Sequence, residues 1–419
     1  MPNKSLRALL RGLMVLLLAL SFVPAASAQA PIKIGFSMAL TGGLAPNGKS
    51  ALLAMQLWEH DINAKGGLLG RKVQLVYYDD QSQPSTVPAI YTKLLDVDKC
   101  DLVVGPYATA QIAPAMPIVM QRHLVFITLL GLAVNDQFHY SRFFQIAPNG
   151  PNATTDFTKG FFDIAKAQNP RPKTVAIAYA DQEYSHNAAD GARANAKAIG
   201  LKVLYDKSYP PTTTDFTPIV RAIQETNPDV LVIASYPPDS VGMVRAIHEV
   251  GFKPKMIGGA MVGLQATTIK TLLGPLLNGI VNYDFWLPGP KTMFPGLADV
   301  LKRYQAEAVK EGVDPLGYYM VPWAYAYLQV LGDAVEATKS LDQAKLARYM
   351  HEATFKTVGG DIKFGKDGEW AKSRMLDVQY QHITGNSAEA FRDPKNTVIL
   401  TPAAYKDGNV IYPYAKALK

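Results

Sequence analysis

Short runs of strand-forming residues alternate with helical patterns along almost the whole chain. Residues 32–36 and 73–78 have the apolar, β-rich composition of buried strands. Between them, apolar side chains recur at helical spacing from Ala51 to Ile62, and two glycines then end the pattern. The alternation continues with strands expected at residues 102–104 and 124–128, and with helices at residues 86–95 and 112–121. This order predicts an α/β fold with a mostly parallel, doubly wound sheet and helices on both faces.

The same alternation starts again after a segment rich in Pro, Gly and Asn at residues 147–152. A second joint is expected at residues 282–290. The later elements are strands at residues 174–179, 201–205, 230–233 and 256–258 and helical patterns at residues 295–310 and 321–338. A chain of 419 residues is also long for one domain. We therefore expect two α/β lobes and a cleft between them, where loops at the carboxyl ends of the strands face a ligand.

The first 28 residues have the pattern of a secretory signal peptide. Lys4, Arg7 and Arg11 give a basic start, an apolar run covers residues 13–20, and small residues end the segment at Ala28. The alternative is a membrane anchor that stays attached, but the run is shorter than the roughly 20 residues that a membrane span needs. We expect cleavage after Ala28 and a periplasmic location.

Composition narrows the classes of function. Cys100 is the only cysteine, so an intramolecular disulfide is impossible. The seven histidines lie far apart in the sequence, and we expect neither a metal nor a cofactor. Removal of Lys4, Arg7 and Arg11 with the leader lowers the formal net charge from +7 to 42 − 3 − 35 = +4, and this excess is spread along the chain without a basic block, so a nucleic-acid partner is not expected. We also expect a monomer.

Residues 43–50 match the phosphate-binding pattern G-x-x-x-x-G-K-[ST], between an expected strand and an expected helix. In a nucleotide hydrolase, Lys49 would neutralise phosphate and Ser50 would hold Mg²⁺. The alternative is the Gly/Pro/Asn-rich first loop that any doubly wound domain needs. We favour the loop, because the signal peptide sends the chain away from nucleoside triphosphates. The adjacent carboxylates Asp79 and Asp80 are interpreted as solvated turn residues, and the chain is not expected to be an enzyme.

An ordered series of short motifs resembles the periplasmic leucine/isoleucine/valine-binding proteins. The series covers the chain up to about Gln381 and consists of residues 32–35, 40–42, 61–67, 78–80, 103–106, 181–184 and 242–251. The resemblance implies a type I periplasmic binding fold whose chain crosses three times between the lobes, near Asn149, Phe285 and Thr357. Lobe 1 would then hold residues 29–149 and 286–356, lobe 2 residues 150–285 and 357–390, and residues 391–419 would form a C-terminal extension whose packing stays open.

Site residues also follow from the resemblance. Family members hold an amino-acid carboxylate with the loop after the third strand, which is here Tyr107, Ala108 and Thr109. Thr109 falls where the family has a serine, and we expect it to donate to a carboxylate; the alternative is that it caps the following helix. Tyr184 falls on a tyrosine that contacts ligand from the second lobe, or else it packs beside the hinge. Asn47 would border the ligand from lobe 1.

Departures from the family pattern indicate a different ligand. Ala260 stands where the family places a glutamate against the ligand ammonium, and Leu130 lies in the segment that should supply a threonine. Burying an ammonium without a carboxylate partner costs several kcal/mol. Tyr236 adjoins the position of another pocket tyrosine, and Met261 adds apolar surface. We therefore predict a pocket that keeps its carboxylate anchor, has lost its ammonium site, and is apolar and aromatic.

The predicted function is capture without chemistry. The chain would bind a small organic acid, aromatic acids included, between its lobes and deliver it to the permease subunits of an ABC uptake transporter. A branched-chain amino acid as ligand is the first alternative. A secreted ligand-sensing subunit is the second, and a phosphate-loop hydrolase is the least favoured.

Overall fold

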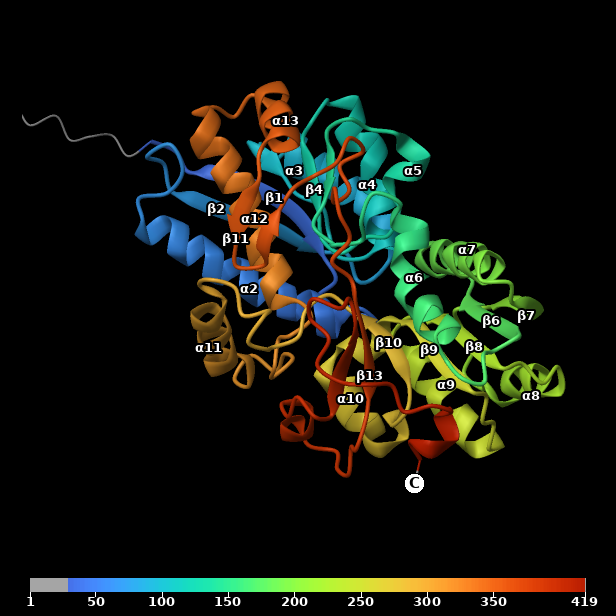
Figure 1. Ribbon diagram of the computed structural model, residues 1–419. Helices are drawn as coiled ribbons and strands as arrows, with labels where there is room; N and C mark the ends of the chain where they lie inside the picture. The colour runs from blue at the N-terminus through green and yellow to red at the C-terminus, as the bar shows by residue number, and fades with distance from the viewer. Residues whose placement is uncertain (1–28, 419) are drawn as a thin grey trace, which may run out of the picture.

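The computed structural model describes residues 29–418 and has two α/β lobes (Figure 1). This confirms the predicted fold class. The predicted signal peptide, residues 1–28, lies outside the described residues. Between residues 29 and 418, no helix has both the length and the apolar character needed to cross a membrane.

Lobe 1 has a parallel sheet in two hydrogen-bonded parts. One part has the strand order β2-β1-β3 and the other pairs β4 with β5. The Gly105 N–H donates to the Ile127 carbonyl at 2.7 Å, and this bond joins the two parts. The strands are β1 (Ile32–Met38), β2 (Val73–Asp79), β3 (Leu102–Val103), β4 (Phe126–Thr128) and β5 (Phe143–Gln145).

Helices from two distant stretches of sequence cover this sheet. The first stretch supplies α2 (Ala45–Ala64), α3 (Val87–Asp96), α4 (Thr109–Gln121) and the short α5 (Asn135–Phe138). The second supplies α11 (Leu297–Ala308), α12 (Val321–Thr338) and α13 (Gln343–Glu352). Helix α2 packs against both α12 and α11, and the hydroxyls of Ser50 in α2 and Tyr304 in α11 meet at 2.6 Å. The late helices therefore complete the core of lobe 1.

Lobe 2 has one seven-stranded sheet with the order β14-β13-β10-β9-β8-β6-β7. Strands β6 to β10 are parallel to one another, whereas β13 is antiparallel to both β10 and β14. The strands are β6 (Thr174–Ala180), β7 (Lys202–Tyr209), β8 (Val230–Ser235), β9 (Met256–Met261), β10 (Val281–Asp284), β13 (Leu376–Tyr380) and β14 (Thr397–Thr401).

Both faces of this second sheet are buried. Along β6, Val175 and Ile177 pack with helices α6 and α7, whereas Ala176 and Ala178 join the core beneath α8 and α9. Successive side chains of a strand point to opposite faces, which is why a doubly covered strand is apolar throughout. The helices of this lobe are α6 (Ala153–Lys166), α7 (Glu183–Ala198), α8 (Thr217–Glu225), α9 (Pro237–Val250) and α10 (Thr267–Leu273).

The third crossing between the lobes lies later than predicted. Residues 355–370 still pack on lobe 1: the Gln145 N–H donates to the Gly368 carbonyl at 2.9 Å, and Trp370 Nε1–H donates to the Ile146 carbonyl at 3.1 Å. The crossing near Thr357 was therefore wrong. The glycines at 359 and 360 instead turn a small hairpin between β11 (Phe355–Thr357) and β12 (Gly360–Ile362).

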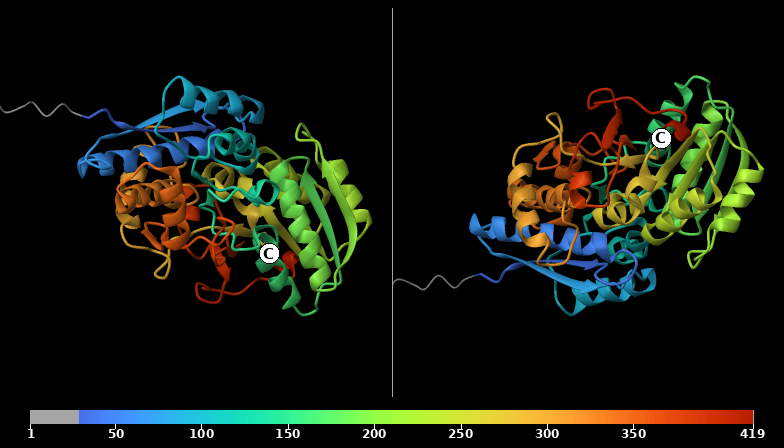
Figure 2. Two further views of the ribbon diagram at one scale, coloured as in Figure 1. Left: turned by 90° about the horizontal axis from the view of Figure 1, so that it is seen from above. Right: turned by 90° about the horizontal axis from the view of Figure 1, so that it is seen from below.

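Residues 391–418 belong to lobe 2 and do not form a separate extension. Strand β14 pairs with β13 at one edge of the sheet. Tyr414 is 1% exposed, and its N–H donates to the Lys255 carbonyl at 2.8 Å. Figure 2 shows the C-terminal end against the lobe that carries β6 to β8.

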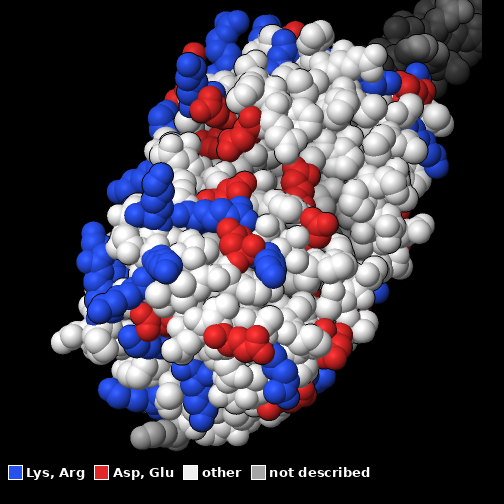
Figure 3. Space-filling view, turned by 90° about the vertical axis from the view of Figure 1, so that its right-hand side faces the viewer, with Lys and Arg blue, Asp and Glu red and all other residues white. Residues whose placement is uncertain are grey.

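Charged side chains of both signs are interspersed on the side of the molecule that Figure 3 shows. Several charged side chains of the described residues form local ion pairs; Arg193, for example, bonds both carboxylate oxygens of Asp206, at 2.7 and 2.8 Å. Exposed pairs of this kind contribute little to stability, about 0–1 kcal/mol each. These exposed pairs are therefore a minor part of what stabilises the fold.

Candidate functional site

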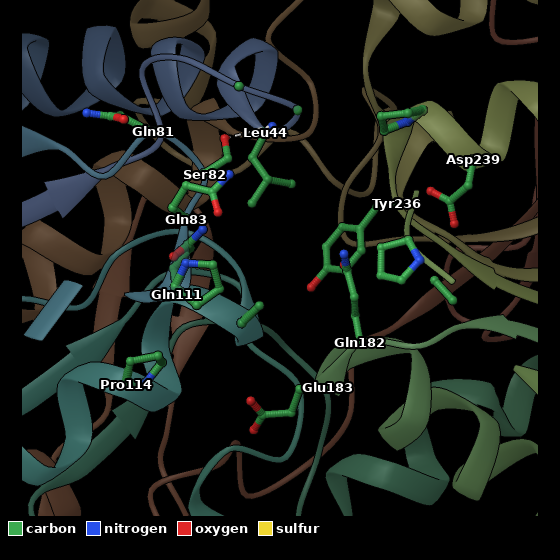
Figure 4. A pocket seen from close by; sticks show the side chains of 17 residues that line it. Leu44, Gln81, Ser82, Gln83, Gln111, Pro114, Gln182, Glu183, Tyr236 and Asp239 are labelled. Atoms are coloured by element: carbon green, nitrogen blue, oxygen red, sulfur yellow. Dashed lines mark hydrogen bonds between the residues drawn. The ribbon is translucent and has the colours of Figure 1, made fainter. Parts of the chain in front are cut away.

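Two adjoining cavities lie where the lobes meet. The outer cavity has a volume of about 450 Å³. Lobe 1 lines it with residues 42–44, residues 81–84 and the first turns of α4, and lobe 2 lines it with Gln182, Glu183, Tyr236 and Asp239, as Figure 4 shows. Because both lobes contribute, this cavity changes shape whenever the lobes move apart.

The inner cavity is small and aromatic. Its volume of about 10 Å³ leaves room for a single water molecule. Rings from both lobes crowd around it: Tyr184 and Tyr236 lie 5.4 Å apart between centroids, and Phe285 stacks on Tyr319 at 5.8 Å. Its aromatic lining consists of Tyr107, Phe157, Tyr184, Tyr236, Tyr283, Phe285 and Tyr319. None of the described residues that line it carries a charged side chain.

The N-terminus of α4 opens onto both cavities. The helix begins at Thr109 and the N-cap is Ala108, so the alternative that Thr109 caps the helix is wrong. Thr109 Oγ1 accepts a hydrogen bond from the Leu132 N–H at 3.0 Å, which leaves the hydroxyl proton free to donate. A helix N-terminus also carries partial positive charge and N–H groups without helical partners. This end of α4 is therefore suited to an anionic group.

Ala108 is held in a strained backbone conformation. Its φ of 79° and ψ of 145° lie where residues other than glycine are rare, and Leu130 across the cavity also has a positive φ, of 54°. Such strain costs of order 1–3 kcal/mol and gathers at functional sites. Both residues line the inner cavity.

The structure brings six of the predicted site residues together. Tyr107, Ala108, Thr109, Leu130, Tyr184 and Tyr236 all line the inner cavity. The Tyr184 hydroxyl donates to the Ala260 carbonyl at 3.1 Å, and burial raises its pKa well above the usual range. Tyr184 thus faces the cavity and packs in the core at once. Its role toward a ligand stays a prediction.

Three predicted residues lie behind the cavity wall. Asn47 is 2% exposed, and its Nδ2 donates to the Tyr107 hydroxyl at 2.8 Å. Ala260 lies within β9, where it accepts the bond from Tyr184, and the Met261 N–H donates to Asn282 Oδ1 at 2.9 Å. None of the three lines either cavity. Asn47 and Ala260 therefore orient tyrosines that do.

The polar residues of the outer cavity were not predicted, and three of them are buried or have a raised pKa. Gln111 lies in the first turn of α4 and is 1% exposed. Glu183 begins α7, and burial raises the pKa of its carboxyl. Asp239 also lines this cavity; burial raises its pKa to about 6, although the Tyr209 hydroxyl donates to it at 2.6 Å and opposes that shift. No Lys, Arg or His side chain is among the described residues that line either cavity.

The motif at residues 43–50 does not form a phosphate-binding loop. Helix α2 starts at Ala45, so six of the eight residues of the motif are helical. Gly48 allows α2 to approach the backbone at Ala39 closely, because a Cβ at residue 48 would lie 2.0 Å from the Ala39 carbonyl oxygen. Ser50 is buried against Tyr304. Among residues 29–418, no group of three or more His, Cys, Asp or Glu side chains is placed to hold a metal ion.

The adjacent carboxylates beside the outer cavity are structural. Asp79 Oδ1 accepts from the N–H groups of Leu40 and Thr41 at 2.9 and 3.2 Å, which orders the loop before α2. Asp80 is fully buried and accepts from the Ser37 hydroxyl at 3.1 Å, so its interpretation as a solvated turn residue was wrong. Burial raises the pKa of Asp80 to about 6.

Comparisons with known proteins agree on one family. A family model described as periplasmic binding protein matches residues 31–383. Leu/Ile/Val-binding protein homolog 8 of Brucella suis biovar 1 (strain 1330) is 26% identical over 377 residues, which is 87% of this chain and 91% of that protein. Leu/Ile/Val-binding protein homolog 7 of Brucella abortus (strain 2308) is 24% identical over 370 residues, covering 85% and 91%.

Solved structures share the fold. A leucine binding protein LivK from Thermotoga maritima matches with a TM-score of 0.74 at 20% identity, covering 88% of this chain and 98% of that one. A solute binding protein of an ABC transporter from R. palustris, in complex with 4-hydroxybenzoate, matches with a TM-score of 0.71 at 19% identity, covering 85% and 94%.

Proposed function

The chain belongs to the periplasmic binding protein family, the substrate-binding components of ABC transporters, and from this membership we propose that it captures a small organic acid, with an aromatic acid as the best fit. The resemblance to leucine/isoleucine/valine-binding proteins is thereby confirmed. In this proposal the protein is extracytoplasmic and delivers its ligand to the permease subunits of the transporter.

The observation that carries the proposal is the uncharged, aromatic inner cavity at the N-terminus of α4. A ligand ammonium buried there would meet no carboxylate, at a cost of several kcal/mol. A ligand carboxylate would meet the Thr109 hydroxyl proton and the helix N-terminus. Stacked and edge-on tyrosines and phenylalanines suit a ring, which gains about 0.5–1.5 kcal/mol per aromatic contact beyond burial.

Capture requires the lobes to move. The inner cavity, at about 10 Å³, is too small for a ring, so the lobes open about their three connecting segments before a ligand enters. Contacts from Tyr184 and Tyr236 of lobe 2 then form only when the lobes close again. Ligand that gains these contacts favours the closed form, and that form is the one offered to the permease.

Known relatives support either of two ligand classes. R. palustris proteins of the same fold bind 4-hydroxybenzoate and 3,4-dihydroxybenzoic acid, which supports an aromatic acid. The LivJ protein of Streptococcus pneumoniae, with a TM-score of 0.72 and 18% identity, was solved with isoleucine. The names of the Brucella relatives favour the same alternative, a branched-chain amino acid. The α-ammonium of an amino acid lies next to its carboxylate, and no residue that lines the inner cavity could pair with it there, so we prefer the acid.

Isothermal titration calorimetry of the purified protein tests the choice. We expect aromatic carboxylates to bind and leucine, isoleucine and valine not to bind. Thr109→Val should weaken carboxylate binding about 10- to 100-fold, since a hydrogen bond to a charged group is worth about 1.5–3 kcal/mol. Thr92→Val, on the exposed side of α3, is the matched control and should bind as wild type. Tight leucine binding without any binding of acids would overturn the proposal.

A further inference from the structure

Polar atoms without partners gather around the outer cavity. Neither the Nε2 nor the Oε1 atom of Gln111 has a hydrogen-bond partner among the described residues, and the same is true of Glu183 Oε1 and the Tyr236 hydroxyl. These are four of the twelve such buried atoms in residues 29–418. Leaving one buried polar group unpaired costs about 1–3 kcal/mol, so a cluster of them calls for an explanation.

The three side chains face one another across the boundary between the lobes. Gln111 comes from the first turn of α4 in lobe 1, whereas Glu183 starts α7 and Tyr236 precedes α9 in lobe 2. Figure 4 shows the Glu183 carboxylate and the Tyr236 hydroxyl directed toward the side where Gln111 lies. Tyr236 lines both cavities, so the outer cavity adjoins the inner one at this side chain.

The charge of this cluster determines which functional groups of a ligand it can bind. Burial alone raises the pKa of Glu183, with no cation beside it to oppose the shift, and no Lys, Arg or His lines the outer cavity within the described part of the chain. Asp239 adds a second carboxyl that already has the Tyr209 hydroxyl as its partner. A second carboxylate on the ligand would be repelled here. A hydroxyl or amino group would instead donate to Glu183 while Gln111 and Tyr236 bind its other side.

The outer cavity also has room for such a group. Its volume of about 450 Å³ falls in the range of about 300–1,000 Å³ that is typical of small-molecule sites. Thr109 lines only the inner cavity, so a carboxylate anchored there would leave the outer cavity to the rest of the ligand.

We infer that the ligand is two-ended and that the outer cavity is a second recognition subsite. The carboxylate end lies at the N-terminus of α4, and a hydrogen-bond-donating hydroxyl or amino group at the far end is bound by Glu183, Gln111 and Tyr236. This inference rests on the proposed function for the carboxylate end and adds a specificity subsite at the other.

Calorimetric titration of the purified protein with four related acids tests the inference. We expect 4-hydroxybenzoate and 4-aminobenzoate to bind at least about tenfold more tightly than benzoate, and terephthalate to bind more weakly than benzoate, because one extra charge-assisted hydrogen bond is worth about 1.5–3 kcal/mol. Glu183→Gln should reduce the preference for the hydroxy and amino acids to about threefold or less.

Two further variants sharpen the result. Asp181→Asn removes a carboxylate from the same loop, but this side chain is 60% exposed and bonds His186, so the preference should be kept. Gln111→Leu removes both unpartnered amide atoms at nearly constant shape; it should lower the preference and raise the melting temperature of the free protein.

The outcomes separate the two claims. If none of the four acids binds, the proposed function fails and the second subsite fails with it. If the acids bind but wild type shows no preference for a donor group, or if Glu183→Gln keeps the preference, only the second subsite is refuted.

Discussion

Asp377 gives a sharp test of how burial governs the stability of lobe 2. This residue lies in β13, is 3% exposed, and its Oδ1 atom has no hydrogen-bond partner among residues 29–418. Helix α6 makes room for it with Gly160, where a Cβ would lie 1.8 Å from Asp377 Oδ2. Burial, assisted by the nearby charge of Asp163, raises the pKa of the Asp377 carboxyl from 3.8 to about 8.

The sign and size of the effect follow from the number of bound protons. The folded pKa is above the unfolded pKa, so the folded protein holds one proton more than the unfolded chain between about pH 4 and pH 8. Stability from this group is fully present below pH 4 and is lost as the pH rises through 8. The slope is about −1.4 kcal/mol per pH unit, or roughly 2.7 kcal/mol lost between pH 5 and pH 7.

The Asp377→Asn variant removes this titration. The packing of the new amide changes the free energy of unfolding by an amount that does not depend on pH. On top of that change, the stability of the variant relative to wild type should increase by about 2.7 kcal/mol from pH 5 to pH 7. Urea unfolding at pH 5, 6 and 7 measures the difference. Asp190→Asn, on the surface of α7 with a 63% exposed side chain, is the control and should show no such trend. A difference between Asp377→Asn and wild type that stays constant with pH would refute the reasoning.

Three other predictions concern lobe 1. Gly48→Ala would place a Cβ 2.0 Å from the Ala39 carbonyl oxygen and should cost about 1–3 kcal/mol in urea unfolding; an unchanged midpoint would contradict the close packing of α2. Ala108→Gly should leave the stability in thermal unfolding unchanged or raise it, because glycine tolerates the positive φ. Ala110→Gly, within α4, should instead cost about 1 kcal/mol of stability. Equal losses for the two variants would argue against strain at Ala108. Burial raises the pKa of Cys100 to about 11, so at pH 8 a thiol reagent should modify it about a hundredfold more slowly in the folded protein than in denaturant, and equal rates would contradict its burial.

Most of the fold could be predicted because its strands are covered on both faces. Strand β8, for example, is buried at every position, so its apolar run stands out in the sequence. The third crossing could not be placed, because a glycine pair such as Gly359 and Gly360 marks a hairpin as readily as a hinge. Residues 397–401 have the composition of a strand, but composition does not say which strand they pair with. Only the structure shows that they pair with β13 and so complete the sheet, far from the first strands of the lobe.

The part of the site that a single loop supplies could be predicted from the sequence. The part that forms only where the two lobes meet could not. Thr109 and its neighbours follow a single strand, so their place at the cavity could be expected from chain order. Ala260 and Met261 are successive residues of β9 and point to opposite faces, so at most one could have faced a ligand, and neither lines a cavity. Gln111 and Glu183 meet only because the lobes face each other, which no local pattern specifies.

The packing of α2 against α11 and α12 also dictates an order of assembly. Ser50 and Tyr304 are separated by 254 residues, and strands β6 to β10 of lobe 2 emerge during synthesis between them. Lobe 2 can thus form most of its sheet from one continuous stretch of sequence. At that stage lobe 1 is incomplete, because the helices that cover α2 have not yet been synthesised. Long-range closure of this kind is slow and leaves apolar surface exposed in the meantime. A chain interrupted before residue 321 would carry one nearly finished lobe beside an unfinished, aggregation-prone one.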